Sequence, residues 1–132
     1  MVGILVVSHS AEAARGIVAI AGQMAGEGVP LDGCGGTDEG GLGTSVPAIV
    51  AAIKGLLGRS DGVVVIPDLG SAVLATRTAM ELVDSDIGKI VIADGPILEG
   101  ALMASVEASI GAGLDRVAQV VGEARDLRKL QD

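Results

Sequence analysis

Apolar runs alternate with segments of helical periodicity along the whole chain. Three apolar runs have the length and the β-branched composition of strands, at residues 2–7, 62–66 and 89–93, and residues 29–34 form a fourth, weaker candidate. Helix-like spacing of apolar residues follows each run and recurs once more at the end, over about residues 10–24, 45–57, 71–83, 97–110 and 114–130. Runs that are apolar at every position predict strands that are covered on both faces.

This alternation predicts an α/β fold with a parallel four-stranded sheet and helices on both faces. Right-handed crossovers leave few topologies, and we expect the strand order 2-1-3-4. The second run contains Pro30, Asp32 and Gly33, which a sheet tolerates best at an edge. With 132 residues and no linker or internal repeat, the chain is expected to form a single domain over residues 1–132.

Each predicted helix is expected to bury the face that holds its larger apolar residues. In the first helix, this face consists of Ile17, Val18, Ala21 and Met24. In the helix over residues 97–110, it consists of Leu98, Leu102, Val106 and Ile110. In the last helix, it consists of Leu114, Val117, Val121 and Ala124.

Composition narrows the class of protein. The net charge is −8 and there is no Phe, Tyr or Trp, so the chain lacks the cations and stacking side chains of a nucleic-acid-binding protein. No apolar stretch approaches the ~20 residues of a membrane span, and no basic leader precedes the first strand. We therefore expect a cytoplasmic protein with no membrane span. The single cysteine, Cys34, allows no internal disulfide and is expected to pack as a small apolar side chain.

The single histidine, His9, directly follows the first strand and lies between two serines. In the order 2-1-3-4 the first and third strands are neighbours, so the end of the third strand brings Asp68 close to His9. Ligands bind at the carboxyl ends of such central strands. Asp68 can accept a hydrogen bond from one ring N–H, which leaves the other ring nitrogen as a nucleophile toward a phosphoryl group.

Three predicted helices begin where they can balance the negative charge of a phosphoryl group. They start near Ser10, Ser45 and Ser71, and each start offers N–H groups without a partner in the helix. Gly43 and Gly70 allow the backbone to approach the phosphoryl group closely. The hydroxyls of Thr44 and Ser71 can donate further hydrogen bonds to it. This chemistry needs no metal ion and no other cofactor. The residues expected to bind the phosphoryl group are Ser10, Gly43, Thr44, Gly70 and Ser71.

Other interpretations of the same residues are open at this point. A Ser–His–Asp hydrolase would use Ser8 or Ser71 as its nucleophile, but the chain lacks the Gly-x-Ser-x-Gly elbow. A flavodoxin-like module that binds an anion or a nucleotide without catalysis also fits the fold, although the loop at 35–43 matches neither nucleotide fingerprint. A phosphorylated Asp68 would require further acids for Mg²⁺. Each polar residue can also be a plain helix cap or turn former.

Four motifs occur in order across almost the whole chain: Val-Ser-His-Ser at 7–10, Gly-Thr-Ser at 43–45, Pro-Asp-Leu-Gly-Ser-Ala at 67–72 and Gly-Pro-Ile-Leu-Glu-Gly at 95–100. Together they resemble the mannose-type EIIA domains of the bacterial phosphoenolpyruvate-dependent phosphotransferase system. The last two motifs are most similar to the DhaM branch of this family, the phosphotransfer subunits of dihydroxyacetone kinases. The resemblance implies the mannose-type EIIA fold.

The resemblance also implies roles for the site residues. His9 would be phosphorylated on Nε2, with Asp68 orienting its ring, and Thr44 and Ser71 would contact the phosphoryl group. The donor would be the phosphohistidine form of HPr. The acceptor would be ADP held by the subunit DhaL, which then phosphorylates dihydroxyacetone on DhaK. The alternative within the family is the EIIA component of a mannose-type sugar transporter.

Members of this family are cytoplasmic homodimers, and the resemblance implies the same here. Longer relatives carry HPr-like and enzyme-I-like domains that this chain does not reach, which implies a separate HPr. Mannose-transport relatives exchange a C-terminal strand at the dimer interface, whereas residues 114–130 are predicted here to be helical. Because a carrier protein must reach His9, we expect a shallow, largely uncharged collar around it, with Leu42, Leu69 and Val73 at an apolar rim.

Overall fold

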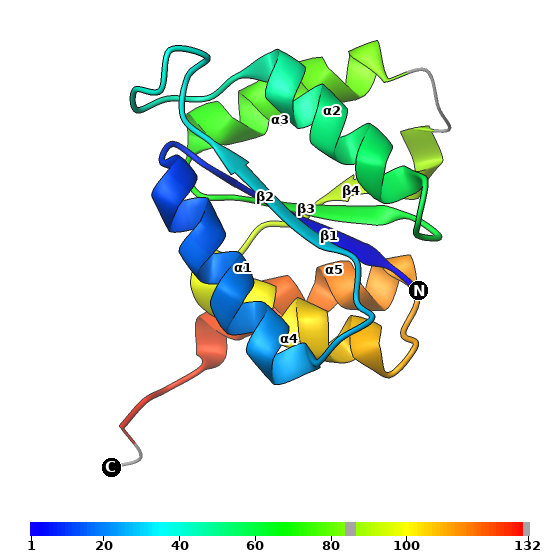
Figure 1. The fold of residues 1–132 in the computed structure, drawn as a ribbon. Helices are drawn as coiled ribbons and strands as arrows, with labels where there is room; N and C mark the ends of the chain where they lie inside the picture. The colour runs from blue at the N-terminus through cyan, green and yellow to red at the C-terminus, as the bar shows by residue number, and fades with distance from the viewer. Residues whose placement is uncertain (84–86, 131–132) are drawn as a thin grey trace.

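The computed structural model describes residues 1–83 and 87–130, and it has one sheet between two layers of helices (Figure 1). The strands are β1 (Gly3–Ser8), β2 (Leu31–Gly35), β3 (Val63–Pro67) and β4 (Ile90–Ile92). The helices are α1 (Ala11–Ala25), α2 (Val46–Leu57), α3 (Gly70–Leu82), α4 (Ile97–Ser109) and α5 (Leu114–Glu123), with short 3-10 helices at Ile87–Lys89 and Ala124–Asp126. Among the described residues, no helix combines the length and the apolar composition needed to cross a membrane.

The sheet has the order β2-β1-β3-β4, and all of its strand pairs are parallel. This confirms the predicted α/β fold and the predicted order. Every residue of β1 and β3 is buried, whereas β2 is only half-buried and lies at an edge. The ends of β1 and β3, which carry the candidate site, are therefore held by the two most buried strands.

The alternation of side chains along the central strands divides the core into two parts. Ile4, Val6, Val64 and Ile66 pack against α1, α4 and α5. Leu5, Val7, Val63 and Val65 pack against α2 and α3. Figure 1 shows these two groups of helices on opposite faces of the sheet. Each fully buried Val, Leu or Ile contributes about 1.5–3 kcal/mol to folding, so aliphatic burial stabilises this fold without aromatic residues.

Helix α4 packs with the face opposite to the one that the apolar pattern predicts. Its buried residues are all small: Gly100, Ala101, Ala104, Ser105 and Ala108. Leu98, Val106 and Ile110 of the predicted inward stripe are 38%, 39% and 75% exposed. The helix lies tightly between α1 and α5, and a Cβ atom at Gly100 would be 2.8 Å from Cγ1 of Val121. The predicted stripe was wrong because this close approach selects small side chains instead of large ones.

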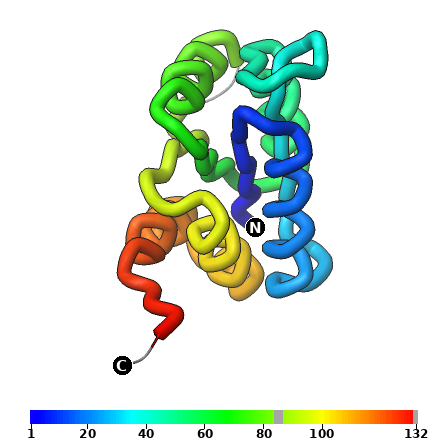
Figure 2. Tube along the Cα trace, turned by 90° about the vertical axis from the view of Figure 1, so that its left-hand side faces the viewer, coloured from blue at the N-terminus to red at the C-terminus, as the bar shows by residue number. Residues whose placement is uncertain are grey.

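Two further expectations about the helices were wrong. Met24 on α1 is 64% exposed and does not belong to the buried face. Helix α5 buries its predicted apolar face but ends at Glu123, so the predicted helix over residues 114–130 was too long. After the 3-10 helix at Ala124–Asp126, the chain leaves the lower layer and runs away from the sheet (Figure 2). Leu127 and Leu130 in this segment are exposed.

Candidate functional site

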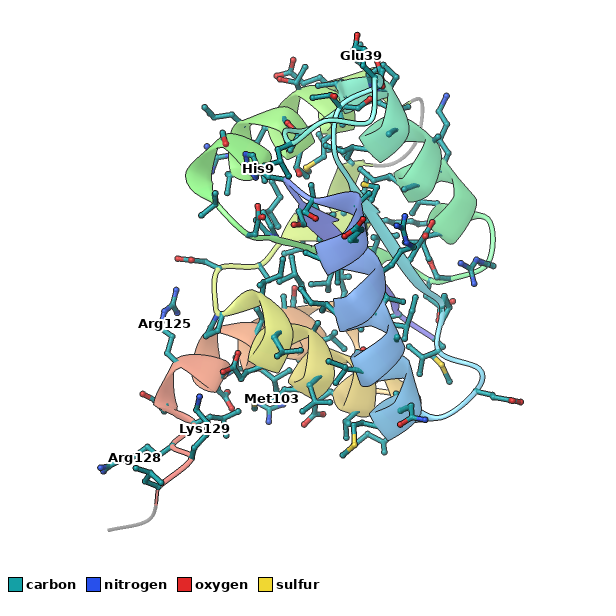
Figure 3. The ribbon with its side chains drawn as sticks, turned by 60° about the vertical axis from the view of Figure 1, so that its left-hand side comes forward. His9, Glu39, Met103, Arg125, Arg128 and Lys129 are labelled. Atoms are coloured by element: carbon teal, nitrogen blue, oxygen red, sulfur yellow. The ribbon has the colours of Figure 1, made fainter. Side chains whose placement is uncertain are left out.

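The loops after β1 and β3 bring His9 and Asp68 together. Val7 and Pro67 are register partners at the ends of these strands, and the Asp68 N–H donates to the Val7 carbonyl at 3.0 Å. This bond continues the pairing of the two strands by one residue, and His9 follows β1 at the same level. Figure 3 shows His9 at the end of the molecule where α1 begins. Two rigid strands thus position the candidate site.

The imidazole of His9 contacts the Asp68 carboxylate through one nitrogen only. Nδ1 lies 2.9 Å from Oδ1 of Asp68, and the two side chains are 26% and 19% exposed. An ionised carboxylate is an acceptor only, so Nδ1 carries the ring proton and Nε2 of the neutral ring keeps its lone pair. The pair therefore sets the tautomer in which Nε2 is the nucleophile.

Ser8 donates a hydrogen bond to the same carboxylate, a role that the sequence did not indicate. This residue is only 3% exposed. Its Oγ donates to Oδ2 of Asp68 at 3.0 Å and accepts from the Ser10 N–H at 3.1 Å. The backbone N–H of His9 donates to the same Oδ2 at 2.9 Å. The one available signal was a serine at the last, buried position of an otherwise apolar strand.

These contacts lower the pKa of the Asp68 carboxyl below its ordinary value. Partial burial acts in the opposite direction and raises the pKa. The hydrogen bonds from the His9 N–H, the His9 ring and the Ser8 hydroxyl outweigh it, because each one stabilises the carboxylate. Asp68 is therefore ionised at neutral pH, as the assignment of the His9 tautomer requires.

The other ring nitrogen of His9 faces the start of α3. Nε2 lies 2.6 Å from Oγ of Ser71, an exposed residue in the first turn of that helix. Leu69 occupies the N-cap position and makes no side-chain cap bond, so Ser71 is not the cap of its helix. Its hydroxyl donates to the Nε2 lone pair instead. The structure thus brings Ser71 together with His9 and Asp68.

The segment before α2 reaches His9 through its backbone. The Gly43 N–H donates to the His9 carbonyl at 2.8 Å. Gly43 has a φ of 139°, and a Cβ atom there would lie 2.8 Å from Cγ2 of Thr37, so only glycine fits. Thr44 follows directly, and Ser45 caps α2 by accepting from the Ala48 N–H. Within the described part of the chain, the Thr44 hydroxyl makes no hydrogen bond.

The remaining two candidates, Ser10 and Gly70, lie on either side of His9. Ser10 is the N-cap of α1, and its Oγ accepts from the Ala13 N–H at 3.2 Å. Its own N–H is already bound to Ser8. Gly70 is the first residue of α3, and a Cβ atom there would have no neighbour within 4 Å. A close approach of the protein backbone therefore does not explain the glycine at this position.

Two open hollows flank the pair at the surface. One, of about 390 Å³, is lined by Asp68, Val73 and Arg77, among others. The other, of about 430 Å³, lies beside the start of α1 and is lined by residues that include Arg15 and Leu42. Leu42 is 82% exposed, and Leu69 on the other side is 60% exposed. The arginines form no ion pair with any described residue, and Glu12 and Asp94 line the same hollows. Exposed leucines therefore stand beside charges of both signs, and the expected largely uncharged collar was wrong.

Comparison with known proteins relates this chain to one family. Residues 3–118 match the family described as "PTS system fructose IIA component". Over 99% of its length, the chain is 34% identical to a Klebsiella michiganensis protein, the "PEP-dependent dihydroxyacetone kinase, phosphoryl donor subunit DhaM", but it spans only 28% of that protein. Over 90% of its length, it is 33% identical to the "PEP-dependent dihydroxyacetone kinase 2, phosphoryl donor subunit DhaM" of Listeria innocua, and it covers 95% of that protein.

Solved structures agree with this relationship. The protein EF1359, described as of unknown function, superposes with a TM-score of 0.81 at 29% identity, over 92% of this chain and 93% of that one. A phosphotransferase system component EIIA from Streptococcus agalactiae superposes with a TM-score of 0.68 at 18% identity, over 94% and 92% of the two chains. The second likeness supports the fold alone.

Proposed function

Because this chain belongs to the EIIA family of the phosphotransferase system, we propose that it is a phosphohistidine carrier of the dihydroxyacetone kinase branch. His9 accepts a phosphoryl group from phospho-HPr and passes it to ADP on DhaL, which phosphorylates dihydroxyacetone on DhaK. The chain thus acts as a phosphotransferase subunit. The DhaM names of the Klebsiella and Listeria relatives support this branch. The structural observation that carries the proposal is the His9–Asp68 pair, which leaves Nε2 as the nucleophile.

In the first half-reaction, the Nε2 lone pair of His9 attacks the phosphorus of the donor phosphohistidine. The donor P–N bond breaks, and its electron pair returns to the donor ring. The proton on Nδ1 stays in place, so the phosphorylated His9 ring gains positive charge that the Asp68 carboxylate, 2.9 Å away, stabilises. In the second half-reaction, a terminal phosphate oxygen of ADP attacks the same phosphorus and the P–N bond to His9 breaks. The positioning of the reacting groups and the fixed charges around them account for most of the acceleration of both half-reactions.

The serine at the start of α3 has a separate part in the proposal. In the unphosphorylated protein, the Ser71 hydroxyl occupies the Nε2 lone pair. It must rotate away when the donor approaches, and it then donates to a phosphoryl oxygen beside the positive end of α3. Thr44 and the backbone at Gly70 are proposed as further phosphoryl contacts. Ser10 and Gly43 already use their N–H groups to hold the loop, so we assign them to positioning His9.

The surroundings of His9 support a protein partner. The ring is partly exposed between two open hollows and is not enclosed in a sugar-sized cavity. Exposed Leu42 and Leu69 provide apolar contact on either side, and Arg15 and Arg77 add positive charge for an anionic partner or nucleotide.

Labelling tests this proposal directly. The chain is incubated with labelled phosphoenolpyruvate, enzyme I and HPr, and the chemical stability of the protein-bound label is measured. A phosphohistidine is labile in acid and stable in alkali, and we expect this behaviour, with loss of all label in His9→Ala. Adding DhaL with bound ADP is expected to discharge the label. Alkali-labile label would point to Asp68, and an unlabelled wild-type chain would contradict the proposal.

A further inference from the structure

The hollow beside helix α3 begins next to the reactive nitrogen of His9. We call it the α3 hollow, and its volume is about 390 Å³. Its lining includes Asp68, Gly70, Val73, Arg77 and Asp94. Asp68 holds the His9 ring, and Ser71, whose hydroxyl contacts Nε2, follows Gly70 directly. A group that reaches a phosphorus atom on Nε2 can therefore extend from there into the α3 hollow.

Arg77 lies along the helical wall of this hollow. It follows Gly70 by about two helical turns, so the two residues share one face of α3. Side chains on a helix lean toward its N-terminus and cover the preceding turn. Arg77 is exposed and lines the hollow together with Val73, which lies one turn nearer to the start of α3. Its side chain is thus directed toward the end of the helix that faces His9.

Arg77 is the charged residue of the α3 hollow that has no counter-charge. The Asp68 carboxylate is bound to the ring and to the backbone of His9. The Asp94 carboxylate is paired with Arg125 at 2.9 Å. Arg77 has neither an ion pair nor a hydrogen bond with any residue that the structure describes. Because a guanidinium presents its N–H donors in a planar fork that matches phosphate oxygens, Arg77 offers the hollow a binding group for a phosphate.

The wall opposite α3 is backbone that is held in place. The Ala93 N–H donates to the Val65 carbonyl at 2.9 Å, which continues the pairing of β4 with β3 by one residue. Gly95 packs so closely on α5 that a Cβ atom there would clash with the Val121 carbonyl. The hollow is therefore formed before any ligand arrives, and an anion that binds in it has to order little more than the Arg77 side chain.

We propose that the α3 hollow receives the inner phosphate of a nucleoside diphosphate acceptor and that Arg77 binds this phosphate. The inference rests on the proposed function, in which ADP is the acceptor. When the terminal phosphate of ADP attacks the phosphorus on Nε2, the inner phosphate keeps its negative charge and stays next to the reacting atoms. The donor phosphohistidine brings no second phosphate. Arg77 therefore has an anion to bind in the second half-reaction and none in the first, so it favours a diphosphate as the acceptor.

The test measures the two half-reactions separately on the same full-length chains. Each chain is charged by phospho-HPr and then discharged by DhaL with bound ADP, and rapid quench gives both rates. In Arg77→Ala, we expect the charging rate of wild type, which also shows that the variant is folded. We expect its discharge to be about 10-fold to 100-fold slower, as for the loss of one hydrogen-bonding partner of a charged group. Arg77→Lys keeps the charge without the planar fork, so its discharge rate is expected to lie between the two.

The matched control is Arg128→Ala, which removes the same charge from another exposed arginine. Figure 3 shows Arg128 well separated from His9, at the opposite end of the molecule. We expect both of its rates to equal those of wild type. Equal discharge rates in wild type and Arg77→Ala would overturn the proposal. A slower charging step in Arg77→Ala would also overturn it, because Arg77 would then act on the donor.

Inorganic pyrophosphate tests the α3 hollow without any partner protein. Nitrogen-15 NMR follows the Arg77 Nε–H signal and the Gly70 and Gly95 amide signals of the unphosphorylated chain as pyrophosphate is added. We expect saturable shifts of all three signals, with the amide shifts lost in Arg77→Ala and kept in Arg128→Ala. Signals that do not respond in wild type would overturn the inference. A wild-type chain that takes no label on His9 would contradict the proposed function instead, and the titration would still decide whether the hollow binds a diphosphate.

Discussion

Asp68 holds His9 by its ring and by its backbone at the same time. Oδ1 of the carboxylate lies 2.9 Å from the ring Nδ1, and Oδ2 accepts the backbone N–H of the same residue at 2.9 Å. The two contacts fix the direction of the ring as well as its tautomer. A single carboxylate therefore orients the ring, and in the proposed mechanism it also stabilises the positive charge of the phosphorylated ring.

Replacing Asp68 by Asn tests the charge, because the amide keeps the shape but offers only one acceptor atom. We expect the rate of label transfer from phospho-HPr to fall by about 100-fold or more in Asp68→Asn, which is the usual cost of removing one group that stabilises charge in a transition state. Rapid-quench measurement of the label gives this rate, and circular dichroism checks the fold. A variant that transfers at the wild-type rate would remove Asp68 from the mechanism.

Replacing Ser8 by Ala tests the support beneath the carboxylate. The change removes a donor to Oδ2 of Asp68 and leaves the Ser10 N–H without its acceptor, so we expect the free energy of unfolding to fall by about 1–3 kcal/mol. The pKa of Asp68 is expected to rise toward its ordinary value, as measured by carbon-13 NMR titration of the carboxyl. Ser109→Ala is the control: it removes a hydroxyl that binds only the Val106 carbonyl on the surface. Equal Asp68 pKa values in wild type and Ser8→Ala would refute this role.

The lowered pKa of Asp68 predicts how stability depends on pH. Because the pKa is lower in the folded chain, the ionised carboxylate stabilises the fold above its ordinary pKa of about 3.9. This contribution is lost as the pH falls through the ordinary value and then through the lower folded value. Urea unfolding of wild type and Asp68→Asn measures it. The difference in unfolding free energy is expected to shrink as the pH falls below about 4. A difference that does not change with pH would contradict the assignment.

Cys34 is expected to react slowly with alkylating reagents. Burial, with a smaller contribution from the nearby Asp32 carboxylate, raises the pKa of its thiol from 9.0 to about 11. Two pKa units reduce the thiolate fraction at pH 8 about 100-fold, and the thiolate is the reactive species. Iodoacetamide labelling followed by mass spectrometry measures the rate, with the urea-unfolded chain as the fast control. Equal rates in the folded and unfolded chain would contradict the burial of this side chain.

The sheet could be predicted because its signals are local. The central strands are apolar at almost every position, which is typical of strands in a parallel sheet that is covered on both faces. The orientation of α4 could not be predicted in the same way. Its pattern shows which face is apolar but not that Gly95 and Gly100 let α5 come close enough to exclude large side chains. The prediction that residues 114–130 form one helix failed beyond the 3-10 helix at Ala124–Asp126, because composition alone does not mark where packing against the core ends.

Some residues of the candidate site could also be predicted from the sequence, and others could not. His9 and Asp68 were predictable because each directly follows a recognisable central strand, and the strand order makes them neighbours. The contact of Ser71 with Nε2 agrees with the sequence argument that the start of α3 points at His9. The part played by Ser8 depends on a hydrogen bond between residues 60 apart in the sequence, for which no periodic signal exists. The roles of Thr44 and Gly70 toward a phosphoryl group stay predictions.

The attachment point of the phosphate tests the central claim most directly. Nitrogen-15 and phosphorus-31 NMR of the chain, phosphorylated by HPr in vitro, identify which ring nitrogen of His9 is bonded to phosphorus. We predict a bond to Nε2, with Nδ1 still protonated toward Asp68. Phosphate on Nδ1, or on any residue other than His9, would contradict the account.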